Sequence, residues 1–249
     1  MAFDLSGITE ELDRRGNCVV FHGLGSSGKT TTLAQACLDK EGVMVLCEEG
    51  LSTLGIEGVK HTGGAVKDWD EFIDILTALA TKSHPYKLVA VDALDKLISS
   101  LEMKVIREDF GGSEAKANSF MAKYSPMLAQ FNRVIKAFSV LQSKGIDVMV
   151  SVHSVITQTK RPDSEPFATY DLALGGGAKT SMSAAIYDYC DACIYLGFKS
   201  MVSDGKIIGD SVRYAYTGGR ETCTAKTRYK LPSEFAFSYT NFKQLMEEL

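Results

Sequence analysis

A glycine-rich turn between an expected strand and an expected helix constrains the fold of this chain more than any other stretch. An apolar run at residues 18–21 leads into Gly-x-x-x-x-Gly-Lys-Thr at Gly23–Thr30, and residues 31–39 are compatible with a helix. The glycines let backbone N–H groups converge on phosphate oxygens, and the amino end of the helix adds a partial positive charge. Strand, turn and helix in this order predict a phosphate-binding P-loop.

The P-loop motif assigns a role to its side chains. Lys29 is placed to reach the β- and γ-phosphates of a nucleoside triphosphate, and the Thr30 hydroxyl is placed to bind Mg²⁺. ATP and Mg²⁺ are therefore the expected ligands. The residues predicted to bind the nucleotide are Gly23, Gly25, Ser26, Ser27, Gly28, Lys29, Thr30 and Thr31.

Length and composition favour a single cytoplasmic domain. The chain has 249 residues, 45% hydrophobic and 23% charged, and no proline- or serine-rich linker divides it, so residues 1–249 are predicted to form one domain. No apolar run is long enough to span a membrane and the first residues lack a signal pattern, so we expect a cytoplasmic protein with no membrane partner. The six scattered cysteines predict reduced core thiols.

Short apolar runs alternate with helical patterns through the first part of the chain. Runs at 42–47, 87–92 and 146–152 predict buried strands, and the stretches between them repeat apolar residues at helical spacing. This alternation predicts an α/β fold in which a mainly parallel, twisted sheet carries helices on both faces. Residues 16–153 form the expected nucleotide-binding core.

The rest of the chain has a different pattern. The segment 154–183 ends in a glycine-rich stretch and is predicted to be a mobile surface loop. Within 191–240, closely spaced strand-like runs alternate with glycine turns, which predicts antiparallel strands at the C-terminal edge of the sheet.

Three strand ends carry the expected catalytic chemistry. Asp92 ends a buried apolar strand, the position of an aspartate that binds Mg²⁺ together with Thr30. The next residue is alanine, so the acid that activates water must come from elsewhere. Glu48 and Glu49 end another strand and are candidates to position or deprotonate that water, although a solvated acidic turn is the alternative. His153 ends a third strand, where it is a candidate γ-phosphate sensor or a structural histidine.

Two cations lie close together late in the chain. Lys226 and Arg228 are two residues apart in a strand-like run, so both side chains project from one face. Neighbouring cations repel each other, and a neighbouring subunit's phosphates would explain the pair as arginine fingers. A solvated strand face is the alternative.

These motifs together resemble the RecA/KaiC/DnaB class of P-loop ATPases. The resemblance rests on the glutamate after the second strand, the aspartate without a following glutamate, the polar residue ending the strand at 146–152, and the late Lys-x-Arg. It implies that the glutamate positions water and that Lys226 and Arg228 reach the nucleotide of the adjacent subunit. The resemblance therefore also implies a head-to-tail homo-oligomer, which is either a ring or a filament.

A narrower resemblance is to phage-encoded RecA-like nucleotide-binding proteins, including Sak-type single-strand annealing ATPases. The sequences HGLGSSGKTT and AKTRYKLP, His153 and the strand-like run Ala192–Leu196 carry it. It implies an ATPase that acts on single-stranded DNA in recombination or strand annealing, in the host cytoplasm, with a single-strand-binding protein as a further partner.

Single-stranded DNA contacts are predicted in the segment 154–183. Lys160, Arg161 and Lys179 supply positive charge, and Phe167 and Tyr170 are candidate stacking groups. Because the net charge of the chain is -4, DNA binding depends on such a local patch.

Two other functions stay open. One is a nucleotide-gated regulator resembling KaiC-like ATPases, with a protein as its partner. The other is a small-molecule P-loop kinase, which the lack of an arginine-rich lid segment disfavours.

Overall fold

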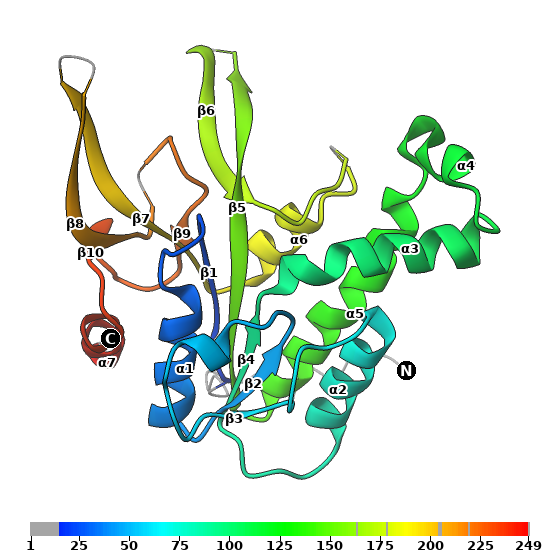
Figure 1. Cartoon of the computed structure of the whole chain (residues 1–249), viewed down its shortest axis with the longest axis horizontal. Helices are drawn as coiled ribbons and strands as arrows, with labels where there is room; N and C mark the ends of the chain where they lie inside the picture. Colours follow the sequence, from blue (N-terminus) through cyan, green and yellow to red (C-terminus); the bar gives the residue numbers. More distant parts are fainter. Residues whose placement is uncertain (1–14, 163, 178, 204–205, 219, 249) are drawn as a thin grey trace, which may run out of the picture.

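Ten strands form a single sheet in the part of the chain that the structure describes. The structure is a computed structural model that describes residues 15–162, 164–177, 179–203, 206–218 and 220–248. The strand order is β10-β8-β7-β1-β5-β4-β2-β3, with β6 paired to β5 and β9 paired to β7 (Figure 1). The chain is therefore α/β, as the alternation of runs predicts.

The parallel strands form the centre of the sheet. Their pairings are β1 with β5 and β7, β4 with β5 and β2, and β2 with β3. In β1, β2, β4 and the first half of β5 both faces are covered and the side chains are almost all apolar, which explains the continuous hydrophobic runs. The parallel strands are β1 (Cys18–Gly23), β2 (Val43–Leu46), β3 (Lys60–His61), β4 (Leu88–Asp92), β5 (Asp147–Arg161) and β7 (Ala192–Ser203).

Antiparallel strands extend the sheet at one edge, but they begin later than predicted. The strand β7 still runs parallel to β1, and the antiparallel pairing starts with β8. Residue 239 does not end a strand; it begins the terminal helix α7 (Tyr239–Glu247). The antiparallel strands of this edge are β8 (Lys206–Tyr216), β9 (Lys226–Thr227) and β10 (Glu234–Ala236).

Helices cover both faces of the sheet, as predicted. One face packs against α2 (Trp69–Thr81), α3 (Ile98–Asp109), α5 (Tyr124–Ser143) and α6 (Met182–Tyr189). The other packs against α1 (Lys29–Asp39) and α7. The short α4 (Glu114–Asn118) lies beyond α3, away from the sheet (Figure 1). Among the described residues, no helix is long and apolar enough to cross a membrane. All six cysteines are buried free thiols, as predicted.

The segment 154–183 is not the loop that we predicted. The strand β5 continues to Arg161, and β6 (Ser164–Leu172) returns antiparallel to it, so that the two form a hairpin. Only residues 173–181 connect this hairpin to α6. The β-branched residues Val155, Ile156, Thr157 and Thr159 favour a strand here. The β5–β6 and β7–β8 hairpins both project from the edge of the sheet that carries the P-loop (Figure 1).

Candidate nucleotide-binding and catalytic site

The P-loop has the predicted strand, turn and helix. The strand β1 ends at Gly23 and α1 begins at Lys29, so the turn lies at the carboxyl edge of the parallel strands. Ser26 and Gly28 adopt left-handed φ values of 63° and 85°. A Cβ at position 23 would lie 2.4 Å from the Leu196 carbonyl oxygen, so only glycine fits there.

Lys29 is buried against its own P-loop. Its Nζ donates to the carbonyl oxygens of Gly23 at 2.9 Å and Leu24 at 3.0 Å, and the residue is 5% exposed. Burial lowers the pKa of Lys29, while the nearby carboxylates of Asp95 and Asp92 act in the opposite direction. The ammonium group is thus held at the turn where phosphates are expected.

Asp92 fits the magnesium role predicted for it. It is the last residue of β4 and is 1% exposed. The Ser151 hydroxyl donates to Oδ1, whereas none of the described residues hydrogen-bonds Oδ2. Burial raises the pKa of Asp92, and the hydroxyls of Ser151 and Thr30 oppose that rise. A buried carboxylate oxygen without a partner, beside the Thr30 hydroxyl, is suited to a magnesium ion.

The two candidate glutamates point to different neighbours. Glu48 Oε2 lies 3.3 Å from Lys96 Nζ, and the charge of Glu48 acts on the pKa of Lys29. Glu49 Oε1 instead accepts a hydrogen bond from the Ala65 N–H at 3.2 Å, in the loop that follows β3. The sequence left the choice open, and the geometry favours Glu48 as the acid that faces the P-loop.

His153 lies beside the P-loop and is fixed by an aspartate that we did not predict. It pairs with Gly23 in the β1–β5 register. Asp95 accepts the His153 N–H at 2.8 Å, and Asp95 Oδ2 lies 3.0 Å from Nδ1. Burial alone would raise the pKa of Asp95, but the hydrogen bonds from His153 outweigh it and lower that pKa. Asp95 therefore orients the ring, and its only sequence signal was an acid three residues after Asp92.

Lys29, Asp92, Glu48 and His153, the residues predicted for the phosphate, metal, water and sensor roles, therefore lie together at one edge of the sheet. The profile of the family described as "AAA domain" matches residues 15–229. The chain belongs to this AAA domain family. A family of this kind consists generally of nucleotide-binding P-loop ATPases. A comparison with curated proteins finds no match.

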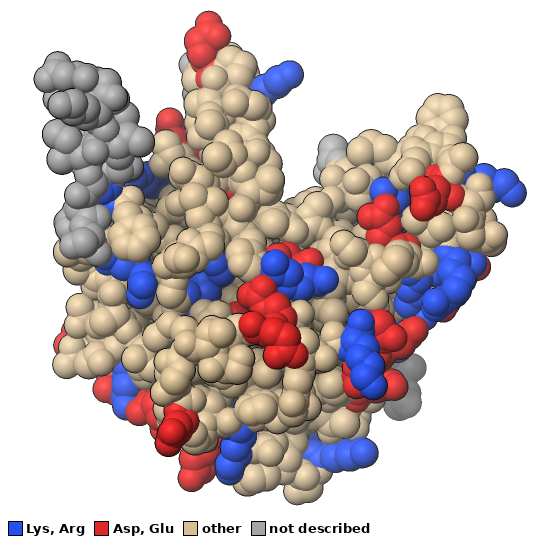
Figure 2. All heavy atoms as spheres, viewed as in Figure 1, with Lys and Arg blue, Asp and Glu red and all other residues tan. Residues whose placement is uncertain are grey.

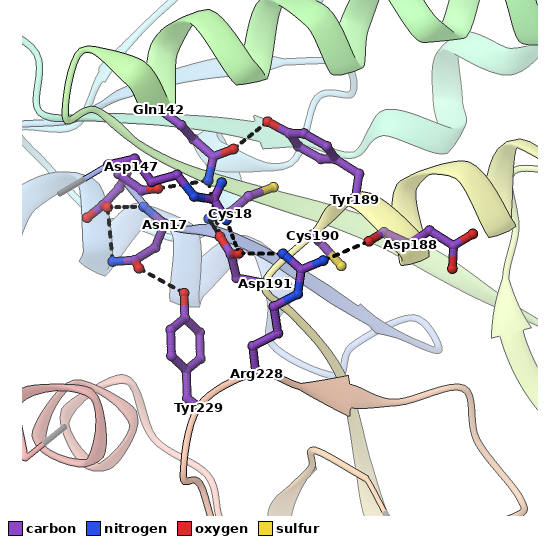
Figure 3. Close-up of polar contacts among 12 residues, drawn as sticks. Asn17, Cys18, Gln142, Asp147, Asp188, Tyr189, Cys190, Asp191, Arg228 and Tyr229 are labelled. Atoms are coloured by element: carbon purple, nitrogen blue, oxygen red, sulfur yellow. Dashed lines mark hydrogen bonds and ion pairs between the residues drawn. The ribbon is translucent and has the colours of Figure 1, made fainter. Parts of the chain in front are cut away.

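Lys226 and Arg228 lie at the opposite edge of this AAA domain from its own P-loop. Their strand β9 pairs with the first residues of β7. Lys226 Nζ and Arg228 Nη2 each donate to the Asp188 carbonyl oxygen at 3.1 Å, so the two side chains do share a face. Figure 3 shows the Arg228 contact. Asp188 is in the last turn of α6, where free carbonyls and the helix dipole attract cations. The pair therefore has a structural contact within its own chain, and the contact with a neighbour's nucleotide stays a prediction.

Asp191 is the centre of the polar network in Figure 3. Its side chain is only 7% exposed and accepts from the Cys18 N–H at 2.9 Å and from Gln142 Nε2 at 3.1 Å. Arg15 and Arg228 both form ion pairs with Oδ1. The carboxylate thus joins the starts of β1 and β7 to the end of α5.

The predicted DNA-binding cations do not form one cluster. Lys160 is exposed near the tip of the β5–β6 hairpin, and Lys179 is exposed in the turn before α6. Because Ser154 pairs with Leu172 at the base of the hairpin, Lys160 is roughly 20 Å along the strand from that base. Arg161 is the last residue of β5, and its side chain lies outside the described part of the structure.

The Tyr170 ring already stacks on another tyrosine of this chain, and base stacking by Tyr170 stays a prediction. Its ring stacks on Tyr195 at 5.0 Å between centroids, and Tyr195 packs on Tyr216 at 5.9 Å. Phe167, the other predicted stacking residue, is half-buried on β6. The aromatic rings of this region therefore contribute to packing beside the P-loop strand.

His22, a buried histidine that we did not single out from the sequence, connects β1 to β5 and to the segment before β9. His22 is fully buried, with Nδ1 2.9 Å from Ser154 Oγ and Nε2 2.6 Å from the Thr224 carbonyl oxygen. The carbonyl can only accept, so Nε2 carries the proton and Nδ1 accepts from the hydroxyl. Burial lowers the pKa of His22 to about 4.

Acid is expected to destabilise the AAA domain through His22. The unfolded histidine takes up a proton as pH falls below its ordinary pKa of about 6.5, whereas the folded one does so only near about 4. Stability is thus complete above pH 6.5 and falls by about 2 kcal/mol between pH 6.5 and 5 from this group alone. Urea unfolding should show a smaller loss for His22→Gln than for the wild type, with the exposed His61→Gln as control. Equal losses in all three proteins would contradict this.

Proposed function

We propose that the chain is a Mg²⁺-dependent, RecA-like ATPase that acts on single-stranded DNA. The observation that carries the ATPase part is the group of Thr30, the unpartnered Asp92 oxygen and Glu48 at the P-loop edge of the sheet. Magnesium, when bound by Thr30 and Asp92, would supply positive charge to the phosphates.

The chain's own residues supply the rest of the reaction. The P-loop N–H groups and Lys29 bind the β- and γ-phosphates. Glu48 accepts a hydrogen bond from the attacking water and takes its proton as the new oxygen–phosphorus bond forms. The bond from the γ-phosphorus to the bridging oxygen breaks, and ADP keeps that electron pair. His153, oriented by Asp95, detects whether the γ-phosphate is present.

A head-to-tail assembly would complete this site. Lys226 and Arg228 share a face at the edge opposite the P-loop, and the Arg228 side chain is 52% exposed, which leaves it accessible to an adjacent subunit. Mixing Lys29→Ala with Arg228→Ala subunits tests this, because the first can still donate the finger that the second lacks. Activity of the mixture above that of either variant supports the shared site. Activity equal to the weighted sum of the two argues against it.

The DNA part of the proposal rests on the two projecting hairpins. The strand β5 continues directly from His153 into the β5–β6 hairpin, on which Lys160, Val155 and Ile156 are exposed. On the face in Figure 2, basic side chains lie at the foot of the notch between the hairpins. Binding of a γ-phosphate near His153 can therefore change the position of the β5–β6 hairpin, the surface that we propose contacts the DNA backbone. The resemblance to Sak-type proteins suggests recombination or annealing as the process, with a single-strand-binding protein as a further partner.

Binding of a fluorescent single-stranded oligonucleotide, measured by anisotropy with and without ATP, tests the DNA part. We expect ATP-dependent binding that weakens with salt, stimulation of ATP hydrolysis by the oligonucleotide, and weaker binding for Lys160→Glu than for Lys136→Glu on α5. Hydrolysis without any DNA binding at low salt would instead favour the regulatory ATPase with a protein partner.

A further inference from the structure

Arg213 is far from the P-loop in sequence but close to it in the fold. It lies in β8, where it pairs with Phe198 of β7. The strand β7 is in turn the neighbour of β1, which leads into the P-loop. The sheet order therefore places Arg213 on the side of the P-loop opposite to β5.

The guanidinium group of Arg213 lies directly against the P-loop backbone. A Cβ built on Gly28 would be 2.3 Å from Nη1, 2.4 Å from Cζ and 2.8 Å from Nη2 of Arg213. All three distances are below a normal contact, so the planar end of the side chain occupies the space that a larger residue at position 28 would need. Gly28 is the residue immediately before Lys29 and α1.

Arg213 is half-buried, and its buried Nε has no partner among the described residues. None of the described carboxylates forms an ion pair with Arg213. Buried N–H donors without an acceptor are costly and rare in proteins, and arginine keeps its charge. A cation with unused donors beside a turn built to bind phosphate is suited to an anion held in that turn.

We infer that Arg213 is a second phosphate-binding cation, supplied by the same chain as Lys29, and that its ligand is the phosphate chain of a nucleoside di- or triphosphate. The inference rests on the proposed nucleotide-binding function and adds a residue that the P-loop motif does not contain. It differs from the role proposed for Lys226 and Arg228, because it requires no neighbouring subunit. A single chain would thus hold the phosphates between Lys29 and Arg213.

A nucleotide titration tests this inference. Arg213→Met and the control Arg133→Met, which removes an exposed arginine of α5, are titrated with a fluorescent ATP analogue and Mg²⁺. The dissociation constant of Arg213→Met should rise by about 10-fold to 100-fold, the range expected for a lost charged hydrogen bond, and that of Arg133→Met should not change. The melting temperature without nucleotide should be nearly unchanged in both, because the Arg213 Nε bonds no described acceptor and Arg133 bonds only Gln130 Oε1 on the exposed side of α5.

The outcomes separate the inference from the proposed function. A folded Arg213→Met variant that binds the analogue as tightly as the wild type overturns the inference and leaves the ATPase proposal standing. A folded wild type that binds no nucleotide overturns the proposed function, and the inference with it. If Arg213→Met does not fold, Arg213→Gln carries the same test, since it also removes the charge but keeps a long polar side chain.

Discussion

Replacing Glu48 with glutamine is expected to lower kcat for ATP hydrolysis by about 100-fold to 1,000-fold, the loss typical of a missing general base. Glutamine keeps the size of the side chain but cannot take a proton from water. Glu49→Gln is the matched control, because Glu49 Oε1 accepts the Ala65 N–H in the loop after β3. Its kcat should stay close to that of the wild type. Steady-state ATP hydrolysis measures both variants.

Nucleotide binding distinguishes a catalytic loss from a damaged site. Titration with a fluorescent ATP analogue should give Glu48→Gln a dissociation constant near that of the wild type, because Lys29 and the P-loop N–H groups are unchanged. If Glu49→Gln lost activity and Glu48→Gln did not, the assignment from geometry would be wrong. The solvated acidic turn would be the better interpretation if neither variant changed kcat.

Replacing Asp191 with alanine is expected to lower the free energy of unfolding by about 3 kcal/mol. The Cys18 N–H is buried and would lose its acceptor, Gln142 would lose one of two, and unsatisfied buried donors cost about 1–3 kcal/mol each. The ion pairs with Arg15 and Arg228 add less, because both arginine side chains are about half exposed. Urea unfolding at neutral pH measures the change.

Asp188→Ala is the control for this effect. The contact that Lys226 and Arg228 make with Asp188 uses its main-chain carbonyl, and the carboxylate points away from the network in Figure 3. A change of at most about 0.5 kcal/mol is therefore expected, as for other surface substitutions. Similar losses for the two variants would show that Asp191 is not the centre of this network.

The parallel part of the fold was predictable because its strands are buried on both faces. Such strands appear in the sequence as continuous apolar runs, and β2, β4 and the first half of β5 coincide with the predicted runs. The second half of β5 and most of β6 leave the core, to which β6 contributes only its last residue, Leu172. Both stretches mix polar with β-branched residues. These two stretches are strands because they pair with each other, and a local sequence pattern does not show which segments pair.

The candidate site was predictable where a motif fixes the backbone. Lys29, Thr30 and Asp92 follow from the P-loop and from a strand end, so their positions agree with the prediction. Which of the adjacent residues Glu48 and Glu49 faces the P-loop depends on the loop that contacts Glu49. Sequence spacing cannot show which of two neighbouring side chains faces the site. Arg213 reaches the site only through the pairing of distant strands, and the partners of Asp95 and His22 lie on other strands or loops, which the sequence alone does not give.

The position of β1 between β5 and β7 has a mechanical consequence. Both projecting hairpins are direct continuations of the two strands that flank β1. The P-loop therefore lies at the root of a two-pronged fork whose prongs have no linker between themselves and that root. The strands that continue into the prongs also place His153 on one side of the P-loop and Leu196 on the other. A ligand held between the prongs would therefore be connected to the P-loop through these two strands.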